Sequence, residues 1–250
     1  MKIVRFRHRG STLEGEVLDP KTLRTPNGSR VPLADAKLLA PCEPTKLVCV
    51  GRNYADHAAE LGNPVPEEPL LFLKPPSAVI ASGEEISYPE YSRLLHFEGE
   101  LAVVISERCK NVPAHEAPHV IRGYTAMNDV TARDAQRADQ QWTRGKCFDT
   151  SAPLGPWLET ELDLLDVAIR TTVNGTRRQE GSTRDLVFRV PHLVAYASRV
   201  MTLEPGDVIA TGTPAGVGEL RIGDTVEVEV EGVGVLCNTV VRGSSEAAIG

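Results

Sequence analysis

The segment His96-Phe97-Glu98-Gly99-Glu100-Leu101-Ala102-Val103-Val104-Ile105 places two acidic residues directly before an apolar run. In a β-strand, residues i and i+2 point to the same face, so Glu98 and Glu100 are expected side by side. The apolar residues at 101, 103 and 105 then point to the other face. Two adjacent carboxylates repel each other, and a divalent cation such as Mg²⁺ or Mn²⁺ compensates because it prefers oxygen ligands. The alternative is a solvated strand edge with both acids facing water.

Length and composition are those of a globular protein. The chain has 250 residues, of which 41% are hydrophobic and 24% are charged, so it can bury a sizeable core. We expect one large domain, or one domain with a small addition. The formal net charge is −7 and there is no run of Lys and Arg, which argues against nucleic-acid binding. The expected partner is a small molecule.

The cysteines and the chain start indicate a cytoplasmic protein. The five cysteines form no Cys-x-x-Cys pair, and their number is odd, which is typical of reduced intracellular thiols. The first eight residues, MKIVRFRH, are too polar for a secretory signal. No apolar run approaches the length of a membrane span, so no membrane partner is expected.

Turn residues divide the chain into two expected units, a small β-rich unit at 1–43 and a larger domain at 44–250. Many strands, few short helices and no regular β-α alternation favour the α+β class. Expected strands lie at 2–7, 14–18, 46–50, 70–74, 100–106, 123–127, 207–211, 224–231 and 234–241. Expected helices lie at 54–61, 114–120, 132–138 and 191–200, with Asn53 and Thr131 as caps of the first and third. Asn174-Gly175 between strands 167–173 and 176–179 predicts a hairpin.

A third carboxylate would complete a metal site beside Glu98 and Glu100. Asp129 is the best candidate because it lies at the end of an expected strand, just before a helix. Three carboxylates make an oxygen-only site with room for water and a chelating substrate. On its own, Asp129 could equally be an ordinary helix-capping residue.

His57 and Glu60 form a second candidate pair. On a helix, residues i and i+3 share a face, so the carboxylate can orient the imidazole. That arrangement suits a general base which draws a proton from water. The alternative is an exposed helix with one favourable pair.

Three further features could bind an anion. Lys146, between a glycine and apolar residues, could reach into a pocket or lie in a surface loop. Arg133 and Gln136 share a helix face, where the guanidinium could bind a substrate carboxylate or face solvent. The loop at 211–218, TGTPAGVG, is not followed by an expected helix, so it fails the context test for dinucleotide binding. Two interpretations of this loop remain: it offers hydroxyls and backbone N–H groups to an anion, or it is a plain turn.

Over nearly all of residues 46–250 the chain resembles the fumarylacetoacetate hydrolase family. Any one of the shared motifs is weak, but together and in order they are highly specific. They are GRNYADH (51–57), FLKP (72–75), HFEGEL (96–101), GYTAMND (123–129), TARD (131–134), VNG (173–175) and TGTP (211–214). The short His-x-x-Glu segment resembles the acylpyruvase and fumarylpyruvate hydrolase branch. The enzyme that names the family has a larger N-terminal domain and a further aspartate where this chain has Val50.

The resemblance implies a mixed β-roll fold and a homodimer. It also implies a Mg²⁺ or Mn²⁺ site at Glu98, Glu100 and Asp129. The His57–Glu60 pair would act as a water-activating dyad on a mobile lid. The residues implied to contact substrate or the transition state are Lys146, Gln136, Arg52, Arg133 and Thr213.

The implied activity is metal-dependent cleavage of a C–C bond in an acylpyruvate-type 2,4-dioxo acid, releasing pyruvate. Oxaloacetate decarboxylation and isomerisation or decarboxylation of 2-hydroxyhepta-2,4-diene-1,7-dioate remain alternatives on the same site. Decarboxylation of oxaloacetate uses the same enolate without an attacking water, and isomerisation needs only proton movement between carbons. A non-catalytic protein that binds metal or an oxo acid on this fold is the alternative from another class. The absence of a Gly-x-Ser-x-Gly motif disfavours a serine hydrolase.

Overall fold

The computed structural model describes residues 1–243, which form three β-sheets and a few short helices. Twelve strands build the largest sheet: β1 (Lys2–His8), β2 (Ser11–Asp19), β3 (Thr22–Arg24), β4 (Arg30–Pro32), β5 (Lys37–Leu38), β6 (Leu47–Gly51), β7 (Leu70–Lys74), β8 (Val79–Ile80), β11 (Gly99–Ile105), β12 (Ile121–Asn128), β14 (Ala152–Glu159) and β17 (Val208–Ala210). The main order is β4-β3-β2-β1-β14-β12-β11-β17-β6-β7, with β5 beside β1 and β8 beside β14.

Two smaller sheets complete the fold: the five-stranded one packs against the large sheet, and the three-stranded one packs against the five-stranded sheet. One contains β10 (Leu95–Phe97), β13 (Thr131–Ala132) and β18 (Gly218–Leu220). The other contains β9 (Glu85–Tyr88), β15 (Ala168–Val173), β16 (Thr176–Ser182), β19 (Thr225–Val230) and β20 (Gly234–Arg242). The helices are α1 (Ala55–Glu60), α2 (Arg133–Ala138), α3 (Thr143–Lys146) and α4 (Val190–Val200), and a 3-10 helix spans Ala114–Val120. The expected α+β class is confirmed.

Strand β11 is the centre of the core. Its residues at 101, 103 and 105 pack in the main hydrophobic cluster, which also receives Leu193 and Val194 of α4. Its residues at 102 and 104 pack in a second cluster with Met127 and Leu154. The expected alternation is therefore confirmed. Glu100 points to the same face of β11 as the residues at 102 and 104, and it is buried because both faces of the strand are covered.

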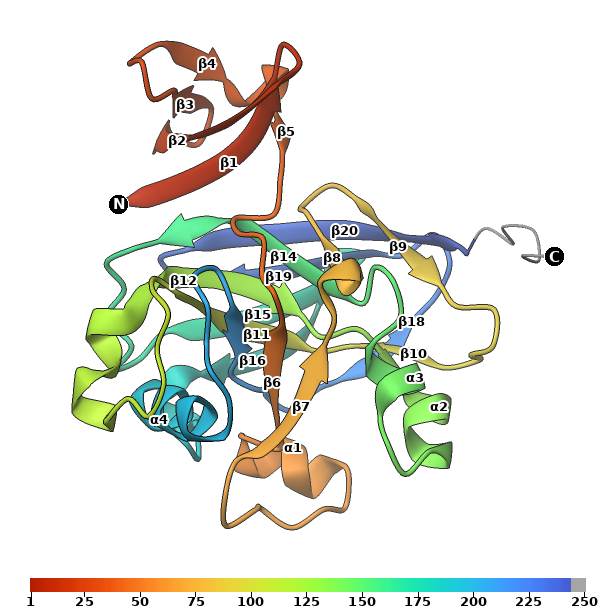
Figure 1. Cartoon of the computed structure of the whole chain (residues 1–250). Helices are drawn as coiled ribbons and strands as arrows, with labels where there is room; N and C mark the ends of the chain where they lie inside the picture. Colours follow the sequence, from red (N-terminus) through yellow and green to blue (C-terminus); the bar gives the residue numbers. More distant parts are fainter. Residues whose placement is uncertain (244–250) are drawn as a thin grey trace, which may run out of the picture.

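The N-terminal strands β1 to β5 lie at one end of the molecule, and α1 lies at the opposite end (Figure 1). Val4, Phe6, Leu23 and Val31 form a separate small cluster in these strands. Strand β1 also continues the large sheet, because Ile3 pairs with Leu158 of β14. A domain boundary at residue 43 remains a prediction.

The hairpin of β15 and β16 is confirmed, with Asn174 at φ 49° and Gly175 at φ 76° in the turn. Both expected helix caps are wrong. Tyr54 and Ala132 occupy the cap positions, and neither caps with its side chain. The Asn53 amide is used instead to join three segments, and the Thr131 hydroxyl donates to the Asp129 carbonyl at 2.9 Å.

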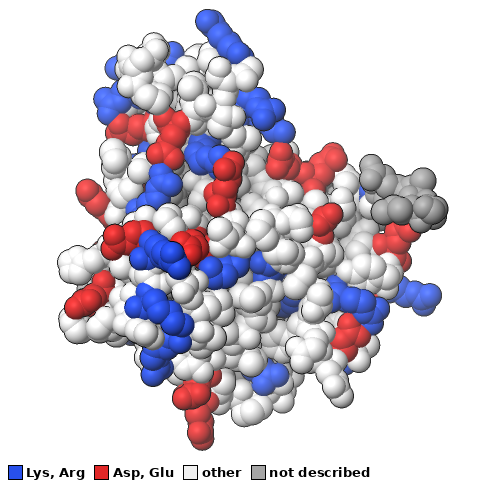
Figure 2. All heavy atoms as spheres, in the orientation of Figure 1, with Lys and Arg blue, Asp and Glu red and all other residues white. Residues whose placement is uncertain are grey.

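Membrane spans and cysteine pairing were both expected to be absent. No helix within 1–243 is long and apolar enough to cross a membrane. All five cysteines are unpaired. Acidic and basic side chains are interspersed on the face shown in Figure 2. The absence of nucleic-acid binding stays a prediction.

Candidate active site

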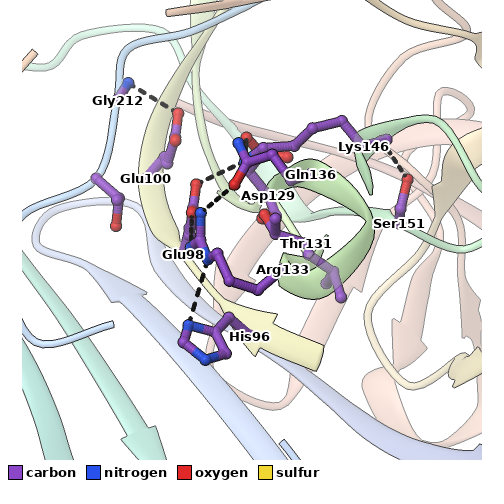
Figure 3. A network of polar contacts seen from close by, with 12 residues as sticks. His96, Glu98, Glu100, Asp129, Thr131, Arg133, Gln136, Lys146, Ser151 and Gly212 are labelled. Carbon is purple, nitrogen blue, oxygen red and sulfur yellow. Dashed lines mark hydrogen bonds and ion pairs between the residues drawn. The ribbon is translucent and has the colours of Figure 1, made fainter. Parts of the chain in front are cut away.

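Antiparallel pairing brings the three candidate metal ligands together. Gly99 of β11 pairs with Asn128 of β12, so Glu98, just before Gly99, lies opposite Asp129, just after Asn128. The Asp129 amide donates to the Glu98 carbonyl at 2.8 Å. With Glu100, each residue offers a ligand atom, and these atoms lie within 4.8 Å of one another. In Figure 3 the Glu100 carboxylate reaches the Gly212 amide, while Lys146 bridges Glu98 and Asp129. The solvated-edge alternative is wrong, because Glu98 is 5% exposed and Glu100 and Asp129 are 1% exposed.

Lys146, the last residue of α3, bridges two of these carboxylates. Its Nζ lies 2.8 Å from Glu98 Oε2 and 2.6 Å from Asp129 Oδ2, and Arg133 pairs with the other Glu98 oxygen. Burial raises the pKa of Glu98, but Lys146 and Arg133 lower it by more, so its net pKa falls. Burial lowers the pKa of Lys146, while Asp129 and Glu98 raise it above its usual range. The site therefore holds buried charges that stabilise one another.

Glu100 is the least compensated of the three acids. Burial, and then the negative charges of Asp129 and Glu98, raise its pKa well above the usual range. Within the described residues its carboxylate accepts one hydrogen bond, from the Gly212 amide at 2.8 Å. An added cation next to Glu100 would offset this excess of negative charge.

Lys74, at the end of β7, is a site residue to which the sequence analysis assigned no role. Its Nζ donates to the Val130 carbonyl and to the carbonyl and hydroxyl of Ser151, at 2.7 to 3.2 Å. It lies 2.8 Å from Asp129 Oδ1. Asp129 Oδ1 is ion-paired but accepts no hydrogen bond within the described residues, so it keeps lone pairs that a hard divalent cation could use in this oxygen-only set. The available signal was a lysine ending the apolar strand LLFLK.

Both dyad residues lie in α1, which follows β6 after a short turn. His57 Nδ1 is 3.2 Å from Glu60 Oε2, and the other Glu60 oxygen accepts from the Gly216 amide at 3.1 Å. His57 is 5% exposed, so the alternative of a solvated surface pair is wrong for the imidazole. The turn into α1 passes through Arg52, whose φ of 59° lies in the left-handed region.

A single cavity of about 400 Å³ unites these parts. Every residue with a role assigned from the sequence lines it: Arg52, His57, Glu60, Glu98, Glu100, Asp129, Arg133, Gln136, Lys146 and Thr213. Phe72, Trp142 and Arg137 also line it and were not predicted. Arg137 is one helical turn after Arg133, a spacing that the sequence already offered.

The loop at 211–218 binds the protein's own carboxylates. Its Gly212 amide donates to Glu100 and its Gly216 amide donates to Glu60. Gly212 has φ 98°, and a Cβ there would lie 2.8 Å from Asn53 Cβ, so this position requires glycine. Thr213 donates to the Gly99 carbonyl at 2.9 Å and accepts from Gln179 at 2.7 Å. The loop therefore connects the triad with the dyad.

Arg133 is largely committed to neighbouring side chains. Besides Glu98, it donates to Gln136 Oε1 at 2.6 Å and to His96 Nδ1 at 3.5 Å. Burial, and then the positive charge of Arg133, lower the pKa of His96 to about 4, so this imidazole is a neutral acceptor. Substrate contact by Arg133 and Gln136 stays a prediction.

The family model for the fumarylacetoacetate (FAA) hydrolase C-terminal domain matches residues 46–241. The chain belongs to the fumarylacetoacetate hydrolase family. An uncharacterised protein of Archaeoglobus fulgidus is 52% identical, with 95% of each chain covered. An oxaloacetate tautomerase of Bacillus subtilis is 40% identical, covering 83% of this chain and 74% of the relative.

Solved structures of relatives share this fold. The 5-carboxymethyl-2-hydroxymuconate delta-isomerase of Mycobacterium smegmatis is 47% identical with a TM-score of 0.91, covering 98% of this chain and all of the other. The fumarylpyruvate hydrolase of Pseudomonas aeruginosa, in complex with Mn²⁺ and pyruvate, is 36% identical with a TM-score of 0.74. That match covers 79% of this chain and 89% of the other. Hydrolases, isomerases and a tautomerase are thus all similar to this family member.

Proposed function

We propose that this protein is a divalent-metal-dependent hydrolase that cleaves acylpyruvate-type 2,4-dioxo acids and releases pyruvate. The observation that supports this most is the position of the His57–Glu60 dyad on the same cavity as the three carboxylates. In a hydrolase of this kind, a base that activates water and a centre that stabilises negative charge must both reach the same bound substrate. The related fumarylpyruvate hydrolase, solved in complex with Mn²⁺ and pyruvate, supports the choice of metal and product.

Glu98, Glu100 and Asp129 would hold Mg²⁺ or Mn²⁺, with water and substrate as the remaining ligands. When bound, the cation would fix the 2-oxo carboxylate end and polarise its ketone. Phe72 and Trp142, which meet edge to face at 5.3 Å between ring centroids, give the cavity an apolar wall that limits water.

The protein's own residues then carry out the hydrolysis. His57 Nδ1 faces Glu60, so the other ring nitrogen takes the proton from water while Glu60 stabilises the imidazolium. The water oxygen bonds to the distal acyl carbon, and the C–C bond to the methylene carbon breaks. The electron pair stays on the pyruvate fragment as an enolate, near the positive charge of Lys146. The proton on His57 is delivered to the methylene carbon, which gives pyruvate and a carboxylic acid.

A second candidate is proton transfer on a 2-oxo acid without hydrolysis. The related oxaloacetate tautomerase and hydroxymuconate isomerase favour it. His57 could move a proton between carbon atoms, or between carbon and oxygen, in the same cavity. Decarboxylation of oxaloacetate or of a hydroxyheptadiene dioate would use the same enolate and need no attacking water.

A turnover panel tests these proposals. It compares acetylpyruvate, fumarylpyruvate, oxaloacetate and a hydroxymuconate-type dioate, each with Mg²⁺, Mn²⁺ or a chelator. We expect metal-dependent pyruvate release from an acylpyruvate, abolished in the Glu98→Gln/Glu100→Gln variant. Turnover only of oxaloacetate or the dioate would replace the hydrolase assignment by the second candidate. Metal binding without turnover of any substrate would indicate a non-catalytic binder.

The dyad has a separate test. His57→Ala should lower kcat for acylpyruvate hydrolysis by about 10²- to 10⁴-fold, because the general base is lost. Mn²⁺ affinity should stay the same, since His57 is not among the proposed ligands. An unchanged hydrolysis rate in His57→Ala would contradict the assigned role.

A further inference from the structure

Gln179 of β16 is a buried polar residue that the proposed reaction does not use. It is 1% exposed and is not among the residues that line the cavity of the triad and the dyad. Its Oε1 accepts from the Gly99 amide at 3.0 Å. Its Nε2 donates to Thr213 Oγ1 at 2.7 Å and to the Pro214 carbonyl at 2.8 Å. One side chain of the five-stranded sheet therefore binds both the start of β11 and the loop at 211–218.

Gly99, Gln179 and Thr213 close a ring of hydrogen bonds. The Thr213 hydroxyl accepts from Gln179 and donates to the Gly99 carbonyl at 2.9 Å, while the Gly99 amide donates to Gln179. The Gly99 amide belongs to the planar peptide unit that follows Glu98, and the Gly99 carbonyl belongs to the unit that precedes Glu100. The ring therefore fixes both peptide planes from which two of the triad side chains extend.

A β-bulge in β16 directs Gln179 inward. Thr171 of β15 pairs with Gln179. The next residue, Thr172, pairs with Arg177, so Arg178 is an extra residue in β16. Three consecutive exposed residues precede the buried Gln179, which breaks the usual alternation of a strand. Bulges re-aim side chains and are over-represented next to active sites.

The bare backbone of Gly99 packs directly against the five-stranded sheet. A Cβ at this position would lie 2.1 Å from Thr171 Oγ1 and 3.1 Å from Val228 Cγ1, so the close approach requires glycine. Thr171 is fully buried, and its hydroxyl makes no hydrogen bond with any residue in 1–243. Thr171 therefore only packs against Gly99, whereas Gln179 binds its peptide group.

We propose that Gln179 is a positioning residue that holds Glu98 and Glu100 in the geometry that a divalent cation requires. This inference rests on the proposed function, because it assumes a cation at the triad. Gln179 acts through Gly99 and the loop at 211–218, since it makes no hydrogen bond with either carboxylate. Partners that orient metal ligands typically contribute about 10- to 100-fold to metal affinity.

Mn²⁺ affinity in the absence of substrate measures this role without depending on turnover. Gln179→Met keeps an unbranched side chain of similar length and removes all three hydrogen bonds. Its Mn²⁺ dissociation constant, from a titration of the full-length protein followed by electron paramagnetic resonance, should rise about 10-fold. Thr171→Val is the matched control, because it has the same shape, lies opposite Gln179 and loses no hydrogen bond within residues 1–243. It should leave the Mn²⁺ affinity unchanged.

Thr213 tests the same ring from its other side, independently of whether Gln179→Met folds. Thr213→Val removes both hydrogen bonds of the hydroxyl and should also weaken Mn²⁺ binding about 10-fold. Thr213→Ser keeps the hydroxyl and should restore the wild-type affinity. The double variant Gln179→Met/Thr213→Val should bind Mn²⁺ no more weakly than the weaker single variant, because both substitutions break one ring.

The outcomes separate this inference from the proposed function. Wild-type Mn²⁺ affinity in Gln179→Met or Thr213→Val would overturn the positioning role and leave the metal-dependent function intact. An equal loss of affinity in Thr171→Val would do the same, because packing alone would then explain the effect. Absence of Mn²⁺ binding by the wild type would overturn both proposals. If the variants bind Mn²⁺ as expected but the wild type cleaves no acylpyruvate, the positioning role stands and the hydrolase proposal fails.

Discussion

Buried charges dominate the site at the scale of single residues, and Lys74 shows how strongly they depend on each other. Its ammonium is 1% exposed and lies between Asp129, Val130 and Ser151. Lys74→Met should lower the free energy of unfolding of the metal-free protein by about 3–5 kcal/mol, because a buried carboxylate loses a countercharge. Urea unfolding in the presence of a chelator measures this.

Lys110→Met is the control for Lys74→Met, since Lys110 is exposed and only donates to the Arg199 carbonyl. It should change stability by less than about 0.5 kcal/mol. An equally small effect of Lys74→Met would mean that Asp129 does not depend on this lysine.

The sequence predicted which side chains lie side by side where local backbone periodicity determines their positions. Glu98 and Glu100 follow from strand alternation, and His57 and Glu60 follow from helical spacing. The role of Asn53 was mistaken because distant partners decided it, whereas the Thr131 hydroxyl donates to a carbonyl only two residues away. Asn53 contacts Phe188 and Thr211, more than a hundred residues away. Lys74 was missed for the same reason, since nothing nearby in sequence indicates its contact with Asp129.

At the scale of elements, Asp207 connects the starts of the parallel strands β6 and β17. Its carboxylate accepts from the amides of Thr45, Lys46 and Glu204 at 2.8 to 3.1 Å, from the Thr45 hydroxyl at 2.7 Å, and pairs with Lys46 Nζ. Burial raises its pKa, but Lys46, Glu204 and Thr45 lower it by more, so the pKa is below the usual range. Strand β6 leads to the dyad, so this connection supports the site.

A depressed pKa makes the contribution of Asp207 dependent on pH. It is fully present above the pKa of the unfolded chain, about 3.9, and is lost as the pH falls through the lower folded value. Asp207→Asn should therefore cost about 2–3 kcal/mol of unfolding free energy at pH 7. The difference from wild type should shrink below about pH 4. Denaturant unfolding at several pH values measures it.

The exposed Glu107 provides the control, and Glu107→Gln should track the wild type at every pH. A difference between wild type and Asp207→Asn that stays constant from pH 7 to pH 3 would contradict ionic bonding by Asp207.

At the scale of the whole molecule, the N-terminal strands have their own core but share a sheet with the rest. Phe6 is fully buried in that small cluster. Phe6→Ala should lower the free energy of unfolding of these strands by about 3–5 kcal/mol. Hydrogen exchange should then increase first in residues 2–38, while Mn²⁺ affinity stays unchanged. Loss of protection throughout residues 1–243 at once would show one cooperative unit and no boundary at residue 43.

The sequence predicted the α+β class and the main hairpin, but not the joining of residues 1–43 to the central sheet. Pairing of β1 with β14 spans about 155 residues, and such long-range register is not visible in local patterns. The homodimer implied by the resemblance stays a prediction. Light scattering after size-exclusion chromatography should give twice the 27.1 kDa of one chain.

Glu98, Glu100 and Asp129 are proposed to hold one divalent cation. The most direct measurement is a Mn²⁺ titration followed by electron paramagnetic resonance, on wild type, Glu100→Gln and the control Glu227→Gln of β19. Glutamine keeps the shape of Glu100 and can still accept from Gly212. We predict one Mn²⁺ per chain in wild type and Glu227→Gln, and at least about 100-fold weaker binding in Glu100→Gln, because a direct ligand is lost. Equal Mn²⁺ binding by Glu100→Gln and wild type would contradict the account.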